Sequence, residues 1–400
     1  MPIINNRQAI YVSLQAKIRL AAVLTAKENK MKNKKFGLKA VFFLIACIFA
    51  GGEEDSSADE AVLYSAGSYN GNPCYWQNSA RRNLSMPSGA RGGTAVAITV
   101  GTDGTVYILG NYRDRNDNLN SCYWQNGTRK DLPIPSGAED CLAVDITVGA
   151  DKTVYILGNY RDRNYNNSFL YWQDAGGRIN VNVTLPYGAY TEGSAIAVGA
   201  DGLVYISGSY GNDPNYPPRF PYFFINVDRA RINLPVPARN DLSSANAIAV
   251  GADGTIYTSG TTGWISGDAG GVTPCYWQND VRRELPLPAN ASSSTSKFPI
   301  VLRANGTVYI AGSYTEWQNN NDIHLICYWQ NGVRRDILLP AGIRGDVNAI
   351  AVGTDGTVYI SGYYVDNSRH IVCYWQGNSR YDIGVLSNGE NITSQFIFIR

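Results

Sequence analysis

Short apolar runs alternate with polar turn residues along most of the chain, and the clearest copy of this pattern spans Ala349–Gln376. It reads Ala-Ile-Ala-Val-Gly, a turn, Val-Tyr-Ile-Ser-Gly, a polar loop and Cys-Tyr-Trp-Gln, and a fourth short run with Arg380 and Ile383 follows. Runs of this length, rich in β-branched and aromatic residues and bounded by turn residues, are typical of β-strands. The Asp355-Gly356 turn predicts a tight antiparallel hairpin between the first two runs.

The pattern recurs seven times with a period of about fifty residues. Period and strand number together predict an all-β fold, a seven-bladed β-propeller with four antiparallel strands per blade over residues 61–400. The tyrosine of the second run marks the copies, which are Tyr64, Tyr107, Tyr155, Tyr205, Tyr257, Tyr309 and Tyr359. The aromatic third run recurs at Tyr75-Trp76, Tyr123-Trp124, Tyr171-Trp172, Phe223-Phe224, Tyr276-Trp277, Tyr328-Trp329 and Tyr374-Trp375.

The two ends of the repeat region complement each other. The first copy has no Ala-Ile-Ala-Val run before Leu63, whereas the chain ends in an apolar run, 395–399, with no partner after it. We therefore predict that the C-terminal strand completes the first blade and closes the ring, which leaves only short, protected sheet edges.

The residue types predict a radial order within each blade. Small residues suit the strand next to the channel, and the Tyr-Trp strand is expected third, between blades. The fourth run is charged, for example Arg334-Arg335-Asp336, as expected of an edge strand that must not pair with another edge. The alternative is a basic belt for an acidic polymer, but the acidic neighbours and the net charge of +1 argue against a nucleic-acid partner.

Residues 1–60 do not follow the repeat. Residues 1–30 are expected to be an upstream extension outside the mature protein, with Met31 as the true start; the alternative is an amphipathic helix at Ile10–Leu24. Residues 31–50 predict a signal peptide, because lysines precede an apolar run too short to span a bilayer. The small and acidic residues 51–60 predict a flexible tether.

Cys47 is a candidate site of lipid attachment. Leu44-Ile45-Ala46-Cys47 resembles the bacterial lipobox, in which the cysteine is acylated. Cleavage after Ala50 is the competing prediction. Both predict a location outside the cytoplasm, either secreted or at the cell envelope, and contact with a membrane only through the lipid.

The remaining cysteines are expected to be reduced and buried. Equivalent third strands should lie farther apart than the roughly 7 Å between Cα atoms that a disulfide allows. Cys141 has no evident partner. The other five occupy one repeat position, namely Cys74, Cys122, Cys275, Cys327 and Cys373.

Two neighbouring repeats carry the pentapeptide Tyr-Arg-Asp-Arg-Asn in the variable loop after the second run. Aromatic and arginine side chains on such loops suit carbohydrate or a charged peptide. The alternative is that each arginine pairs with an aspartate of its own loop and each tyrosine packs on its strand. The candidate ligand-binding residues are Tyr112, Arg113, Arg115, Tyr160, Arg161 and Arg163.

Trp264 and Trp317 are further candidates for ligand contact. They depart from the repeat pattern and fall in the longest expected loops, 261–274 and 313–326. The alternative is that these indoles cover the core as a lid.

Catalytic signals are missing from the sequence. The two histidines, His324 and His370, have no second ligand at metal spacing, and no nucleophile elbow or phosphate-binding glycine loop occurs. The sequence therefore predicts no catalytic residue, no metal and no cofactor, and a protein that is not an enzyme.

The unit AIAVGTDGTVYISGYY, with CYWQNG at the third run of other repeats (122–127 and 327–332), resembles a bacterial β-propeller repeat family with secreted and lipoprotein members. The resemblance covers residues 61–400 and implies the propeller fold and an extracytoplasmic location, but no single activity. We expect a monomer that binds a protein or carbohydrate on its loop face. One alternative is a carbohydrate-active hydrolase or lyase with Asp, Glu and Arg at the channel mouth, and another is a structural subunit of an envelope complex.

Overall fold

In the computed structural model the described residues belong to the unit Ala61–Arg400, and their regular structure is all β-strand. The predictions for residues 1–30, the signal peptide 31–50, Cys47 and the tether 51–60 lie outside the described residues. Within the described part of the chain, no helix is long and apolar enough to cross a bilayer. The described residues are 62–78, 80–134, 136–163, 166–174, 177–179, 190–211, 218–226, 230–238, 242–266, 269–293, 297–318, 321–337, 339, 343–366, 369–385 and 392–399.

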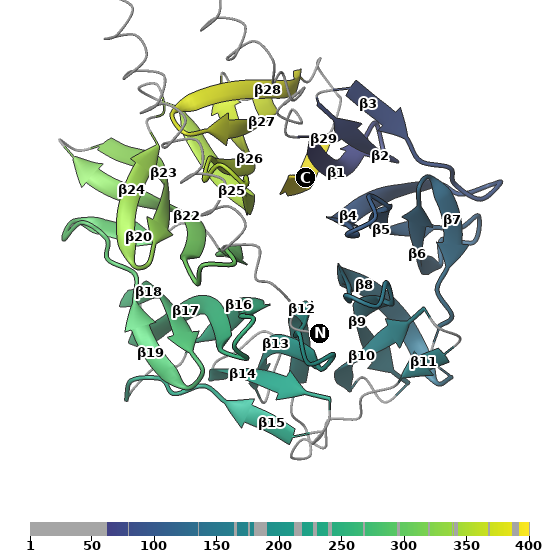
Figure 1. Cartoon of the computed structure of the whole chain (residues 1–400), viewed down its shortest axis with the longest axis horizontal. Coiled ribbons are helices and arrows are strands. Elements are labelled where there is room, and N and C mark those ends of the chain that lie inside the picture. Colours follow the sequence, from purple (N-terminus) through teal and green to yellow (C-terminus); the bar gives the residue numbers. More distant parts are fainter. Residues whose placement is uncertain are drawn as a thin grey trace, which may run out of the picture. The chain divides into compact units, whose positions relative to one another are not determined.

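Seven small antiparallel sheets form a seven-bladed β-propeller, as the period predicts (Figure 1). Blade 1 consists of β29 (Ile392–Ile399), β1 (Leu63–Tyr69), β2 (Asn72–Gln77) and β3 (Ala80–Asn83). Blade 2 consists of β4 (Gly92–Val100), β5 (Val106–Arg113), β6 (Leu119–Gln125) and β7 (Thr128–Asp131). Blade 3 consists of β8 (Ala138–Val148), β9 (Val154–Asp162), β10 (Asn167–Gln173) and β11 (Gly177–Ile179). Blade 4 consists of β12 (Tyr190–Val198), β13 (Val204–Gly211), β14 (Arg219–Ile225) and β15 (Ala230–Asn233).

Blades 5 to 7 complete the set. Blade 5 consists of β16 (Ser244–Val250), β17 (Ile256–Ser266), β18 (Ala269–Gln278) and β19 (Val281–Glu284). Blade 6 has five strands, because both β20 (Ala291–Ser293) and β21 (Ile300–Leu302) pair with β22 (Val308–Gln318), which is followed by β23 (Asn321–Gln330) and β24 (Val333–Ile337). Blade 7 consists of β25 (Arg344–Val352), β26 (Val358–Asp366), β27 (Arg369–Gln376) and β28 (Ser379–Val385).

The last strand, β29, pairs antiparallel with β1 over Leu63–Tyr69 and forms the inner strand of blade 1. The aromatic runs lie on the third strands and the charged runs on the fourth, which matches the predicted radial order. All four residues of β3, for example, are exposed.

The turn between the first two strands differs from the predicted tight hairpin. In blade 2 the ladder stops at the pair Val100 and Val106, so five residues connect the strands. Gly104 takes the left-handed conformation, with φ +85°, whereas Asp103 contributes its side chain, since Oδ1 accepts the Thr105 N–H at 3.0 Å. Aspartate is therefore a cap in this turn rather than a second residue with positive φ.

The hydrophobic core lies between neighbouring blades. One cluster, for example, joins Ile326 and Ala311 of blade 6 to Ile350, Ile360 and Trp375 of blade 7. All six cysteines of the described residues are buried, as predicted, and none of them forms a disulfide there.

In blades 2, 3, 5 and 6 the third-strand tryptophan also links the blade to the segment before it. Trp124 donates its indole N–H to the Ser85 carbonyl at 2.9 Å, and Trp277 donates to the Pro235 carbonyl at 2.8 Å. Both indoles are almost completely buried, so the rings fill the space between blades and their polar edges hold the crossover segments.

Candidate functional site

The inner strands share a one-residue β-bulge at the same position. In β4 the register shifts between Ala95 and Ala97, which leaves Val96 as the extra residue. A bulge re-aims side chains and is common next to active sites. The equivalent extra residues of β8, β12, β16 and β25 are Val144, Ser194, Asn246 and Asn348.

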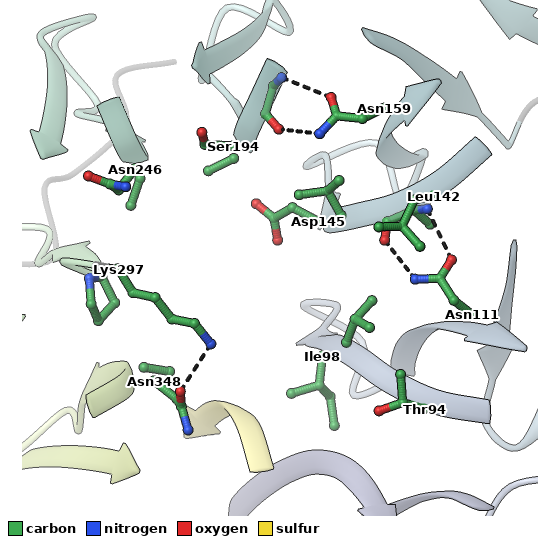
Figure 2. Close-up of a pocket in the computed structure, with 18 of the residues that line it drawn as sticks. Thr94, Ile98, Asn111, Leu142, Asp145, Asn159, Ser194, Asn246, Lys297 and Asn348 are labelled. Atoms are coloured by element: carbon green, nitrogen blue, oxygen red, sulfur yellow. Dashed lines mark hydrogen bonds between the residues drawn. The ribbon is translucent and has the colours of Figure 1, made fainter. Parts of the chain in front are cut away.

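A cavity of about 830 Å³ lies in the central channel, because residues of the inner strands of blades 2 to 7 line it (Figure 2). The bulge residues belong to this wall, together with Asp145, Lys297 and apolar side chains such as Ile98 and Ile350. A cavity of this volume, mostly apolar with a few polar groups, is typical of a small-molecule site.

Asp145 is an acidic residue at a repeat position that is otherwise apolar. Its Oδ1 accepts the Ile146 N–H at 2.9 Å, and its Oδ2 accepts the Ile196 N–H of the next blade at 2.9 Å. Burial raises the pKa of Asp145 to about 6, although both N–H donors oppose the shift. A carboxyl group with this pKa can give or take a proton near neutral pH. The residues at this position in blades 2, 4, 5, 6 and 7 are Ala97, Ala195, Ala247, Pro299 and Ala349.

Lys297 places a cation on the other side of the same cavity. Its Nζ donates to Oδ1 of Asn348 at 3.0 Å (Figure 2). Burial lowers the pKa of Lys297, and the negative charge of Asp346 opposes this effect. The channel wall is therefore polarised, with a carboxylate on blade 3 and an ammonium on blade 6.

A second cavity, of about 290 Å³, borders the first at blades 3 and 4. Leu119, Leu142, Asn159 and Glu192 line both cavities. Tyr190 also lines the second, and its hydroxyl donates to Oε2 of Glu192 at 2.8 Å. Burial, and then the charge of Glu192, raise the pKa of Tyr190, so the phenol keeps its proton at neutral pH.

The first predicted loop supplies residues to the larger cavity. Tyr112 and Arg113 line it, but the Tyr112 side chain is buried and donates to Asp131 at 3.4 Å. Arg113 is exposed and donates to the Asp117 carbonyl at 2.9 Å. Arg115 is exposed and lines neither cavity.

The second predicted loop lies at the smaller cavity. Tyr160 and Arg161 line it, and Arg161 forms an ion pair of 3.0 Å with Asp140 of the neighbouring strand. Arg163 is exposed and lines neither cavity. The structure thus brings the two pentapeptides to adjoining cavities, while the arginine pairing follows the alternative interpretation in part.

Trp264 and Trp317 lie in strands rather than in loops, which corrects the expected loop boundaries. Trp264 pairs with Gly271 in the β17–β18 hairpin, and Trp317 pairs with Asp322 in the β22–β23 hairpin. The threonine and aromatic residues of these segments favour continued strand pairing. The two indole side chains lie outside the described part of the structure.

Four residues of the site were not among the predicted ones, namely Asp145, Tyr190, Glu192 and Lys297. For Asp145 and Lys297 the signal was available, because each breaks a repeat position that is otherwise small or apolar. Among the described residues, no group of three or more His, Cys, Asp or Glu side chains could hold a metal ion.

No family model matches the chain, and the search of curated proteins gave no match. Solved structures do share its fold at low identity. An ulvan lyase, a polysaccharide lyase, is 9% identical with a TM-score of 0.50, and the alignment covers 82% of this chain and 92% of that one. A puromycin-hydrolysing peptidase from Mycobacterium tuberculosis is 12% identical with a TM-score of 0.51, over 79% of this chain and 50% of that one. A sialidase from Trypanosoma rangeli is 11% identical with a TM-score of 0.42, over 74% of this chain and 55% of that one.

The prediction that the chain is not an enzyme is contradicted by the comparison with the polysaccharide lyase, since an enzyme has the same fold. The reason for the error is physical. Motif searches need catalytic residues at short, fixed spacing, whereas a propeller gathers its channel residues from blades about fifty residues apart in sequence. At this level of identity the likenesses establish the fold and not a particular activity.

Proposed function

We propose that the chain is a carbohydrate-active enzyme, a lyase or a hydrolase, that holds a glycan in the channel and across its mouth at blades 3 and 4. The observation that supports this proposal is the pair of cavities that share Leu119, Leu142, Asn159 and Glu192. Together they offer an elongated site rather than a single pocket, which suits a chain of sugars. The polysaccharide lyase with the same fold agrees with this substrate class.

The Tyr190–Glu192 pair supplies the proton chemistry of a lyase. Elimination needs a group that removes a proton from the sugar ring and a group that protonates the leaving oxygen. The Tyr190 hydroxyl can donate its proton, and the Glu192 carboxylate that accepts its hydrogen bond at 2.8 Å can receive one. Asn159, which lines both cavities, can position the substrate, although its amide also binds the Gly193 backbone.

Asp145 is the group that favours a hydrolase. Hydrolysis of a glycosidic bond uses one carboxylic acid as a proton donor and one carboxylate as a base or nucleophile. With its pKa raised to about 6 by burial, Asp145 is partly protonated just below neutral pH, as a proton donor requires. Glu192 is then the candidate carboxylate, because it also lines the larger cavity.

The test is product analysis with the full chain on a panel of acidic and neutral polysaccharides. A lyase gives an unsaturated sugar with ultraviolet absorbance, and a hydrolase gives new reducing ends without it. Glu192→Gln and Tyr190→Phe should each lower kcat by about 100-fold or more for a lyase, and Glu192→Gln and Asp145→Asn should do so for a hydrolase.

Tyr364→Phe is the matched control, because Tyr364 also donates to a carboxylate, Asp382 at 3.1 Å, but lines neither cavity. Absence of products from every polysaccharide, or full activity in all three site variants, would refute the proposal. Binding without products would indicate that the site only recognises glycans.

We also propose that this activity is located outside the cytoplasm, at the envelope or secreted. The support is in the sequence, namely the signal-like residues 31–50, the lipobox-like Cys47 and the repeat's similarity to secreted bacterial propellers. Mass spectrometry of the mature N-terminus tests this location. An acylated Cys47 or a start after Ala50 would support it, and an intact Met1 or Met31 would contradict it.

A further inference from the structure

The inner part of blade 6 departs from the repeat just before β21. Ile300 pairs with Ile310 in the same way as Ile98 pairs with Ile108, which places Lys297 and Phe298 at the positions of Ala95 and Val96. In most blades the first position of this pair is buried and the second lines the cavity. Ala95, Ala143, Ala245 and Val347 are the buried residues, and Val96, Val144, Asn246 and Asn348 are the lining residues.

Blade 6 reverses this order. Phe298 is completely buried and packs against Trp329, with ring centroids 6.4 Å apart, whereas Lys297 lines the cavity. The backbone at Phe298 has φ +46°, in the left-handed region. That conformation costs a non-glycine residue about 1–2 kcal/mol. This unfavourable backbone conformation exchanges the directions of the Lys297 and Phe298 side chains and places the lysine in the channel.

The exchange is held in place from the neighbouring blade. The Ser259 hydroxyl of β17 donates to the Phe298 carbonyl at 2.5 Å, and Ser259 is itself buried. Strain that a structure maintains in this way commonly serves a site. A packing role alone would be met by a buried apolar residue such as blades 2, 3, 5 and 7 have at the position of Lys297.

One amide group contacts the cation, and a second lies in the wall of the same cavity. Asn348 of blade 7 accepts a hydrogen bond from Nζ at 3.0 Å, and Asn246 of blade 5 lines the same side of the cavity (Figure 2). Both are bulge residues of the blades on either side of Lys297. An ammonium that is partly withdrawn from water favours an anionic partner, and carboxamides suit the hydroxyl groups of a sugar.

We propose that Lys297, with Asn348 and Asn246, forms a subsite for the single negative charge of an acidic sugar, either the carboxylate of a uronic acid or a sulfate ester. The proposal deepens the proposed function, because it names the charge of the substrate, and it rests on that function for the choice of a sugar. A single lysine matches a monoanion, and a cavity of about 830 Å³ has room for several sugar rings.

The test is equilibrium binding of monosaccharides to the full chain by calorimetry or ligand-observed NMR. The probes are glucuronate, glucose 6-sulfate and glucose. The variants are Lys297→Met and, in case the first does not fold, Lys297→Gln. Lys152→Met is the control, because it removes an exposed lysine from a turn that lines neither cavity.

At least one anionic probe should bind more tightly than glucose, and Lys297→Met should weaken that binding by about tenfold or more, while Lys152→Met should not. The preferred anion identifies the acidic group. Equal binding of glucose and both anions, no binding of any probe, or unchanged binding in both Lys297 variants would overturn the subsite. Because no turnover is measured, these outcomes are separate from a failure to find products.

Discussion

Lys152 of blade 3 forms an ion pair with Asp103 of blade 2, with 3.1 Å between Nζ and Oδ2. Lys152 has φ +68° at a turn position where five other blades have glycine. The ion pair is exposed and is worth about 0–1 kcal/mol, while the left-handed conformation costs a lysine about 1–2 kcal/mol. The backbone cost equals or exceeds the gain from the ion pair, so this departure from the repeat links two blades without a net gain in stability.

Lys152→Gly should therefore leave the free energy of unfolding unchanged or raise it by up to about 1 kcal/mol. Lys152→Ala should lower it, because alanine keeps the backbone strain and loses the ion pair. Chemical denaturation of both variants measures the difference. Equal stability of the glycine and alanine variants would show that the backbone at this turn is not strained.

The glycine that recurs within the second strand of every repeat should not tolerate a side chain. A Cβ atom on Gly260 would clash with the Ser244 carbonyl oxygen of the inner strand. The clash is with backbone, so the strands must separate, and we expect Gly260→Ala to lower the free energy of unfolding by about 1–3 kcal/mol. The substitution Val281→Ala, at an exposed position of the same blade, is the control. An alanine variant as stable as the wild type would contradict the close strand contact.

The close contact at Gly260 also shows why the fold could be predicted from the sequence. Glycine recurs at this position in all seven copies, and in blades 2 to 7 an added Cβ would crowd the inner-strand backbone or an aromatic ring. Such repeated requirements reveal the period, the strands and the fold. The site residues do not repeat in this way. Asp145, Lys297 and Glu192 each stand at a repeat position where no other blade has the same residue. Their meeting in one channel depends on the ring, which local spacing does not encode. The reversal at Phe298 depends on a single backbone angle and could not be read from residue types.

Asn159 fastens blade 3 to blade 4, and its loss should destabilise that junction. Its amide donates to the Gly193 carbonyl at 2.9 Å and accepts the Gly193 N–H at 2.8 Å, in the manner of a strand pair. Asn159→Ala leaves both backbone groups without these partners, which should lower the free energy of unfolding by about 2–3 kcal/mol. Asn72→Ala, at an exposed strand end, is the control. Equal stability of the two variants would mean that water replaces the amide at no cost.

Asp145 should make stability depend on pH in the opposite sense from an ordinary salt-bridged carboxylate. Burial raises its pKa from 3.8 to about 6, so between these values the folded protein keeps a proton that the unfolded chain has released. Its contribution to stability is complete below pH 3.8 and is lost as the pH rises through about 6. The change amounts to about 3 kcal/mol at most.

Urea denaturation at a series of pH values, for the wild type and Asp145→Asn, measures this effect. The wild-type free energy of unfolding minus that of the variant should fall as the pH rises from about 4 to 7. Asp103→Asn provides the contrast, because the Thr105 backbone N–H and then Lys152 lower the pKa of Asp103 to about 2. The difference between the wild type and that variant should instead fall as the pH drops below about 4. A difference for Asp145→Asn that is flat with pH, or that rises, would show that the carboxylate is already ionised in the channel, and Asp145 could then not serve as the proton donor of a hydrolase.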